Sequence, residues 1–551
     1  MPEYLSPGVY VEEVPSSVKP IAGVSTSTAG FIGLVSDSLP VPPTLAKTRT
    51  LAKDQVDGTL TTYPLDDYPV VTVANSYQVS VDGQKADATL QNTGEGKSQI
   101  VFKAAPAKGS TITVNYTSGP LVGDEIGTWD GSVRKFSLNK FPVVTDANSY
   151  KVRIGANVAG ATSVTAKLEN AADASGATAT ITGDVPTAVK AGDKVFADYM
   201  TFQIFRPAAQ VGQAVLCTNF TEYKNAFGDF SLDPNHRLLT QAVYGFFNNG
   251  GTRCYVARIT AESDLDKALA AFELVDEIAI VAAPGMTSDT VRSKVVAHCK
   301  SLGDRFAVLD GPATIDSLTK LTKTGADSGV MPARSDYAAW YFPWIKVYDP
   351  VAQKFEANNP KGIVSVAPSG HIAGIYARVD NNRGVHKAPA NEPIVGALDV
   401  TQRLSKAQQD GLNPKGVNCI RVLNDNILLW GARTVGGDDN ADLKYINVRR
   451  TLLFLRESIN EGTQWVVFEP NSPALWQQIT RNVTAFLMNV WRSGALFGTT
   501  PREAFFVKCD GETNPQSSID QGMVVTEIGV AIVRPAEFVI FRISQWAAPG
   551  S

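Results

Sequence analysis

The chain has 551 residues, enough for three or four domains at about 150 residues each. Its 50 basic and 54 acidic residues leave a formal charge of −4, so no general attraction to nucleic acid or to an acidic membrane is expected. With 44% hydrophobic and 19% charged residues, the sequence is typical of a soluble protein with packed cores. No apolar run reaches the roughly 18 residues of a membrane span, and the acidic, proline-interrupted start Met1–Tyr4 is unlike a secretory signal.

The five cysteines are scattered, and the closest two, Cys217 and Cys254, are 37 positions apart. Without a Cys-x-x-Cys or Cys/His ligand spacing, neither a zinc site nor a disulfide framework is expected. Reduced, buried thiols in a cytosolic folding environment fit this pattern better. With only four histidines, the sequence predicts no metal site, and it carries no motif for an organic cofactor.

The first twenty residues contain prolines at positions 2, 7, 15 and 20, and the strand-like segment 9–14 lies between them without a local partner. Because flanking prolines hinder pairing with sequence neighbours, we expect this segment to add to the edge of a distant sheet. A frayed tail is the alternative. A strand of small residues follows at 24–35, and a proline-rich stretch around 40–43 indicates a linker.

A repeat follows the linker. Residues 57–82 align with residues 130–155 at a constant offset of 73 (130 − 57), and 12 of the 26 positions are identical. Runs rich in valine and threonine between Gly, Asn and Asp turns predict that each copy is a small β-sandwich or barrel. We therefore expect an inserted all-β region over 38–202, with units at about 57–125 and 130–200.

The remainder predicts a mixed α/β, multidomain (α+β or α/β) fold with a discontinuous core formed by 21–37 and 203–395. Strand-like runs at 254–259, 278–283 and 306–309 alternate with helical patterns at 238–247, 265–274 and 291–301, which favours a sheet covered by helices. A C-terminal domain over 396–551 should contain amphipathic helices at 445–461 and 472–494. Of its two final extended runs, 523–533 and 538–543, the second is apolar on both faces and should be buried between layers.

The segment Thr93–Ser98 ends like a phosphate-binding loop, but Gln91 stands where that motif requires a glycine. A strand pattern, not a helix, follows it, and a helix N-terminus is needed to hold phosphate. A hairpin turn inside the first repeat explains the segment better.

Three other patterns favour structural explanations. The aspartates of loop 436–442 lack the spacing of a calcium-binding loop, so a solvated loop is expected. Ser369 and His371 are two positions apart and diverge on a helix, so Ser369 is predicted to be a helix N-cap. Arg449 and Arg450 are expected to form ion pairs on a helix face. No arrangement supports an enzyme.

Seven strings in order along the chain resemble the tail sheath proteins of contractile-tailed phages. They are Ser6–Val14, Asn248–Val256, Ala367–Gly374 leading to Arg383–Asn391, Leu429–Thr434, Tyr445–Thr451, Phe468–Asn471 and Arg534–Phe538. The β insertion lies outside this resemblance, although such sheaths vary most in outward-facing insertions.

The resemblance implies a structural protein that polymerises as stacked six-subunit rings around an inner tube and contracts to drive the tube through a bacterial envelope. It implies a position in the virion tail, assembly in the host cytoplasm, and contacts with further copies, the tube protein, the baseplate and a tail terminator. Neighbours would exchange terminal strands, beginning with an arm at residues 1–20. The exchange residues are Val9, Tyr10, Val11, Glu12, Val14, Phe538, Val539, Ile540, Phe541 and Ile543.

The resemblance also implies that the C-terminal domain faces the tube, where Arg481 and Arg492 on the helix at 472–494 could meet an acidic surface. Pairing of both arginines within the subunit is the alternative. For the whole chain, the sheath of a phage-derived injection particle remains open, and the β repeats leave room for a carbohydrate- or receptor-binding protein. A nucleotide hydrolase built on Gly94–Ser98 is the third class.

Overall fold

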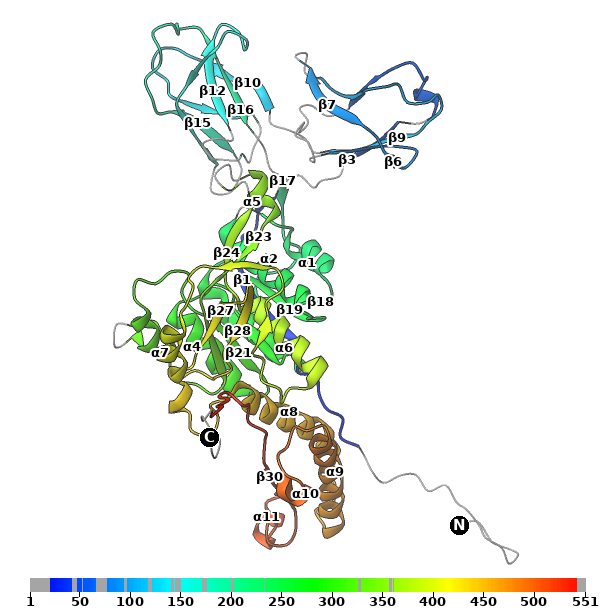
Figure 1. Ribbon diagram of the computed structural model, residues 1–551, viewed down its shortest axis with the longest axis vertical. Coiled ribbons are helices and arrows are strands. Elements are labelled where there is room, and N and C mark those ends of the chain that lie inside the picture. The colour runs from blue at the N-terminus through cyan, green and yellow to red at the C-terminus, as the bar shows by residue number, and fades with distance from the viewer. Residues whose placement is uncertain are drawn as a thin grey trace, which may run out of the picture.

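The structure is a computed structural model, and it describes most of the chain. The described residues are 20–41, 47–51, 53–65, 77–93, 97–116, 121–139, 143, 150–170, 176–199, 203–231, 233–325, 329–355, 359 and 361–542. The expected strand at 9–14 and Ile543 lie outside these ranges. Figure 1 shows an α/β core in the middle of the elongated molecule, two groups of strands at one end, and the helices α8 and α9 at the other.

A nine-stranded sheet forms the centre of the core. Its order is β18 (Val215–Cys217), β19 (Cys254–Ile259), β1 (Ala29–Leu34), β20 (Ile280–Ala282), β21 (Phe306–Asp310), β22 (Ala338–Phe342), β27 (Val417–Leu423), β28 (Asn426–Trp430) and β25 (Glu392–Pro393). Neighbours from β19 to β27 are parallel, and the strands at both margins pair antiparallel. Since β1 lies between β19 and β20, residues that precede the β groups complete a sheet built from residues that follow them.

Helices cover both faces of this sheet, as the alternating pattern predicted. Phe31 of β1 packs in a buried cluster with α2 (Pro234–Asn248) and α6 (Ser369–Arg383). The next residue, Ile32, points to the other face, in a cluster with α3 (Leu265–Glu273) and α4 (Asp289–Leu302). Buried on both faces, the strands read as nearly continuous apolar runs.

Smaller elements complete the core. They are α1 (Phe220–Phe227), α5 (Pro350–Phe355), α7 (Lys406–Leu412) and a three-stranded sheet of order β24 (Ile363–Val366), β23 (Ile345–Tyr348), β26 (Ala397–Val400). The strands β27 and β28 follow the boundary expected at 395/396, yet they pair within the main sheet.

Two groups of strands lie beyond α5 at one end of the molecule (Figure 1). The first has sheets β3-β9-β5-β6 and β4-β8-β7, and the second has sheets β10-β16-β12-β13 and β11-β15-β14. The first comprises β3 (Lys47–Leu51), β4 (Thr62–Leu65), β5 (Gln78–Val81), β6 (Gln84–Lys85), β7 (Ala88–Thr93), β8 (Lys97–Phe102) and β9 (Ile112–Tyr116). The second comprises β10 (Leu121–Thr128), β11 (Lys135–Ser137), β12 (Lys151–Gly155), β13 (Thr162–Val164), β14 (Ala166–Asn170), β15 (Ala177–Ile181) and β16 (Lys194–Tyr199).

Each β group has its own buried apolar cluster, one within 51–116 and the other within 129–199. The chain leaves the core through β2 (Leu39–Val41) and returns through β17 (Gln203–Phe205), and these strands pair antiparallel. The exit and the return are therefore adjacent.

The C-terminal part is built around two long helices, α8 (Ile446–Thr463) and α9 (Pro473–Arg492). The α9 helix begins as the sequence predicts, with Ser472 as N-cap and Pro473 in its first turn. Its apolar stripe is buried in a separate cluster that also contains Ile21. The shorter elements are α10 (Pro501–Ala504), α11 (Gln516–Asp520) and the antiparallel pair β29 (Phe505–Lys508) and β30 (Glu527–Val530). Among the residues that the structure describes, no helix has the length and apolar character that crossing a bilayer requires.

Candidate functional site: the roots of the two chain ends

The C-terminal run departs from its prediction. Phe538, Val539, Ile540 and Phe541 are 71%, 69%, 78% and 84% exposed, and residues 538–542 belong to no strand. The expected burial between layers is wrong for the single chain, because no other described segment supplies a strand beside them. Single exposed apolar side chains are common on protein surfaces, but four in succession are unusual.

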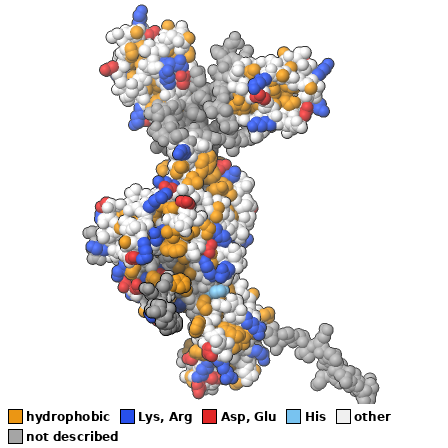
Figure 2. Space-filling model, viewed as in Figure 1, with side chains coloured by type: hydrophobic (Ala, Val, Ile, Leu, Met, Phe, Trp, Pro, Cys, Tyr) orange, Lys and Arg blue, Asp and Glu red, His pale blue; other side chains and the backbone are white. Residues whose placement is uncertain are grey.

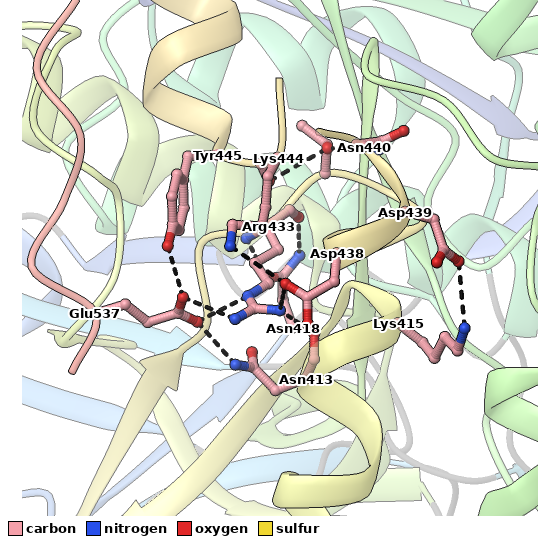
Figure 3. Close-up of polar contacts among 11 residues, drawn as sticks. Asn413, Lys415, Asn418, Arg433, Asp438, Asp439, Asn440, Lys444, Tyr445 and Glu537 are labelled. Atoms are coloured by element: carbon pink, nitrogen blue, oxygen red, sulfur yellow. Dashed lines mark hydrogen bonds and ion pairs between the residues drawn. The ribbon is translucent and has the colours of Figure 1, made fainter. Parts of the chain in front are cut away.

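The residue before this run, Glu537, is firmly held (Figure 3). Arg433 makes a two-pronged contact with it, Nε donating to Oε1 and Nη2 to Oε2, both at 2.8 Å. Asn413 Nδ2 donates to Oε1 at 2.7 Å, and the Tyr445 hydroxyl donates to Oε2 at 2.9 Å. Bidentate arginine–carboxylate contacts are among the strongest and most directional hydrogen bonds in proteins. The exit point of 538–541 is therefore fixed.

The electrostatics of the Glu537 contact favour the ionised pair. Burial alone would raise the pKa of the Glu537 carboxyl, but hydrogen bonds from Arg433, Asn413 and Tyr445 outweigh burial and lower it. The Arg433 side chain is only 3% exposed, and its Nη1 also donates to Asp438 at 2.9 Å. Two carboxylates thus compensate one buried guanidinium.

Secondary structure positions Arg433 just beyond the end of β28. Asn418 of the neighbouring strand β27 accepts from the Arg433 backbone N–H at 2.8 Å and donates to its carbonyl at 2.7 Å. The following loop, 436–442, is held by charge pairs: Lys444 lies 3.2 Å from Asp438, and Lys415 lies 3.3 Å from Asp439. These aspartates serve as ion-pair partners. No cluster of three or more His, Cys, Asp or Glu side chains suited to a metal ion occurs in the described ranges.

Residues 531–537, which we call the C-terminal root, follow the surface of the C-terminal helices before reaching Glu537. Ala531 N–H donates to the Ala504 carbonyl at 2.8 Å. Asn447 of α8 donates to the Val533 carbonyl at 3.2 Å and to the His386 carbonyl at 2.8 Å. The C-terminal root therefore forms hydrogen bonds with α8 and α10 before it reaches the contact between Glu537 and Arg433.

Residues 20–27, the N-terminal root, run along α8 into β1. Arg450 Nη1 and Nη2 donate to the two Asp380 oxygens at 2.9 and 2.6 Å, and Nη2 also donates to the Thr26 carbonyl at 2.8 Å. The Thr26 hydroxyl completes the group by donating to Asp380 at 2.6 Å. The Arg450 and Asp380 side chains are 3% and 2% exposed, and the guanidinium also lies over the Tyr376 ring. Val24 N–H donates to the Ser458 hydroxyl at 3.1 Å.

Two cavities adjoin this root, and both are lined by residues 24–26. One has a volume of about 110 Å³ and lies against the core loops at 276–279, and the other has a volume of about 640 Å³ and lies against α6 and α9. With open space beside it, the root has less packing to hold it than a core segment. Its position therefore depends strongly on the polar contacts with Arg450, Asp380 and Ser458.

The two arginines proposed to face the tube, Arg481 and Arg492, lie on exposed positions of α9, off its buried stripe. Within the described part of the chain, neither forms an ion pair.

Two other sequence motifs have structural explanations. Thr93 and Lys97 are paired residues at the ends of the antiparallel strands β7 and β8, so a strand begins at Lys97 in place of the helix that a phosphate site needs. All five cysteines are buried and free of disulfide bonds.

The prediction for Ser369 is wrong in detail. Pro368 occupies the N-cap position, and Ser369, the first helical residue, donates its hydroxyl to buried Asp310 at 2.7 Å. His371 points elsewhere and is fully buried, and burial lowers its pKa to about 4. Arg449 pairs with Asp336, so the predicted ion-pairing of both neighbouring arginines of α8 is confirmed.

Comparison with known proteins gives consistent matches. Residues 259–435 match the phage tail sheath protein central domain, and residues 438–545 match the phage tail sheath C-terminal domain, together more than half of the chain. The tail sheath protein of Burkholderia phage BcepMu is 26% identical over 267 residues, 47% of this chain and 53% of the relative. The major tail sheath protein of Serratia phage KSP20 is 28% identical over 172 residues, 30% of this chain and 42% of the relative. The chain thus spans about half the length of the curated relatives it matches.

Solved structures agree. A chain of the anti-feeding prophage baseplate is 32% identical with a TM-score of 0.51, covering 61% of this chain and 89% of that one. A chain of an extracellular contractile injection system, the PVC sheath complex in its contracted state, is 28% identical with a TM-score of 0.53, covering 61% and 88%. Because both sheath domains match and together cover more than half of the chain, the chain belongs to the contractile tail sheath protein family.

Proposed function

We propose that the chain is a structural subunit of a contractile sheath that polymerises as stacked six-subunit rings around an inner tube. Contraction would drive the tube through a bacterial envelope. The observation that carries this proposal is the exposed apolar run 538–541, which leaves the subunit at the rigid Glu537 clamp. A neighbour's sheet edge would bury these side chains and satisfy their backbone hydrogen bonds at once.

The two chain ends supply the joints in this proposal. The exchanged strands would be Val9–Val14, which lie outside the described residues, and Phe538–Ile543, described up to residue 542. Figure 1 shows the described ends on different sides of α8, so one subunit would reach two different neighbours. Such head-to-tail contacts propagate into rings or helical filaments. A receiving edge is available at the two-stranded sheet β29–β30, to which no other described strand is paired.

The sheath needs no catalytic site and no cofactor. Strand-linked subunits can rotate as rigid bodies without separating, so an extended polymer can relax to a packing of lower free energy. Reversing the populations of two such states from 1:99 to 99:1 takes roughly 5.5 kcal/mol per two-state unit. Small differences in contact free energy between the two states, repeated around a ring, would add up to this amount.

The β groups would be two copies of one module, inserted into the core and facing outward. The 73-residue offset maps β4 and β5 onto β11 and β12, and strands in equivalent order occupy equivalent places in both groups. Figure 2 shows basic and acidic side chains scattered over both, as expected of solvated modules. Because Val41 and Gln203 are register partners, residues 42–202 can be replaced by Asn-Gly to close a β-hairpin. This variant should still polymerise, and insolubility or failure to assemble would reject the proposal.

The tube contact would involve α9. Reversing both charges, with Arg481→Glu and Arg492→Glu, should abolish assembly on the tube and spare tube-free self-assembly, because a repeated contact sums many weak ion pairs. Lys300→Glu, on an exposed position of α4 in the core, is the control. Unchanged attachment of the double variant would exclude this face. Baseplate and terminator proteins, at the two ends of the sheath, are the remaining proposed partners.

Negative-stain microscopy of the purified chain tests the function directly. Helical tubes or stacked rings are expected, and Val11→Pro or deletion of residues 1–20 should leave folded, soluble subunits, because proline removes a backbone donor from the added strand. Contractile sheaths of normal length from either variant would contradict the proposed exchange of terminal strands. A phage and an injection particle are separated by whether neighbouring genes encode a capsid, and binding of the β groups on a glycan array would instead favour a receptor-binding role.

A further inference from the structure

The roots of both chain ends meet at the beginning of α8. Tyr445, the N-cap residue, donates to Glu537 in the C-terminal root, and Asn447 donates to the Val533 carbonyl of the same root. Arg450, one turn further on, holds the Thr26 carbonyl of the N-terminal root. Two segments that lie more than 400 positions apart in the chain are thus held by three side chains within the six-residue stretch 445–450.

The spacing of these residues explains how one helix serves both roots. Positions i and i+3 lie on one side of a helix, so Asn447 and Arg450 face the interior together, and both are buried. Arg449 points to another side, where it pairs with Asp336 over the Tyr337 ring and contacts neither root. The two arginines thus have similar chemistry, but only Arg450 contacts a root.

We propose that the first two turns of α8 form a bracket that couples the two roots, so that loosening one root loosens the other. A buried charge pair lies beside each root. Glu537 of the C-terminal root faces Arg433, whereas Arg450 faces Asp380 of α6, which accepts a hydrogen bond from the Thr26 hydroxyl of the N-terminal root. When Glu537 is lost, Arg433 keeps only the half-exposed Asp438 as a charge partner among the described residues. An under-compensated buried guanidinium draws water and displaces the segment that carries it. That segment is in direct contact with the start of α8, because Arg433 and Tyr445 form an antiparallel bridge and the Ile446 N–H donates to the Ala432 carbonyl.

In the polymer, this coupling would mean that exchange of one terminal strand with a neighbour favours exchange of the other terminal strand. A strand captured by one neighbour would hold its root, steady α8, and so reduce the ordering cost of the second exchange. This consequence rests on the proposed sheath function. The coupling itself is a property of the isolated chain and can be measured without any polymer.

The test is hydrogen exchange with mass spectrometry on the purified, unassembled full chain, comparing wild type with Glu537→Gln. We expect exchange to rise about tenfold in peptides covering the C-terminal root and also, by at least about threefold, in those covering the N-terminal root, 20–27. Arg449→Lys, the matched control, should change neither root. An increase confined to residues 531–537, with the N-terminal root at its wild-type rate, would overturn the coupling.

A milder variant distinguishes coupling between the roots from general unfolding of the chain. Tyr445→Phe removes one hydroxyl from Glu537 while leaving the Arg433 contact, and it should raise exchange at both roots by smaller, proportionate amounts. Absence of any change at the N-terminal root in both variants excludes the bracket. Failure of the wild-type chain to form sheaths would instead reject the proposed function, and the exchange result would stand independently of it.

Discussion

The ion pair between Arg450 and Asp380 offers the sharpest test of the energetics. Replacing Asp380 by Asn keeps the shape of the side chain but leaves the Arg450 guanidinium buried without its carboxylate. Removing one partner of a buried pair costs about 3–5 kcal/mol, and retained hydrogen bonds should place this variant near about 3 kcal/mol. Asp336→Asn is the control, because Asp336 pairs with the adjacent Arg449 of α8 but its side chain is 28% exposed. We expect about 1 kcal/mol or less there.

A double-mutant cycle completes this test. Arg450→Met with Asp380→Asn removes the uncompensated charge, so the double variant should lose less stability than the two single variants together, by about 2 kcal/mol. Native-state hydrogen exchange of the amides of α8 reports the local free energy of opening, which suits a multidomain chain better than one global transition. Additive effects, or a cost for Asp380→Asn no larger than that for Asp336→Asn, would refute the view that the buried pair anchors the N-terminal root.

Further predictions concern the exposed run, a helix contact and pH. Phe541→Asp should change the melting temperature of the isolated chain little, because the side chain is exposed, yet abolish sheaths in micrographs; assembly at wild-type length would contradict its role. Gly374→Ala should lower the free energy of unfolding by about 1–3 kcal/mol in urea titrations, since its Cβ would lie 2.5 Å from a carbonyl oxygen of α2; an unchanged midpoint would count against this contact. Burial lowers the pKa of His236 and His371 to about 4, so unfolding takes up protons between about pH 6.5 and pH 4. The free energy of unfolding should therefore fall as the pH is lowered through this range. Burial raises the pKa of Asp310 to about 6, and below pH 6 this carboxyl contributes the opposite change in the free energy of unfolding. Melting curves against pH for wild type and His371→Gln test it, and an equal slope in both would contradict the assignment.

The sequence alone determined the α/β core to a large extent. The strand predicted at 254–259 is observed at Cys254–Ile259, and the helix predicted at 265–274 is observed at Leu265–Glu273. Local periodicity suffices here, because a strand buried on both faces and a helix with one apolar stripe have distinct patterns. The start of α9 could also be predicted from the sequence. The Ser472 side chain accepts from a backbone N–H of the first turn, and Pro473 has no N–H that would need a partner there. The family, too, followed from ordered local strings.

The tertiary structure alone decided which distant residues meet. No periodicity indicates that Arg433 would find Glu537, 104 positions later, or that Arg450 would hold both Asp380 and Thr26. The sequence marked Arg450 as an ion-pair partner, but the partner depends on how α6, α8 and β1 pack. The exposure of residues 538–541 likewise could not be predicted from the sequence. An apolar run predicts burial, and hydrophobicity carries no information about whether the burying surface belongs to the same chain.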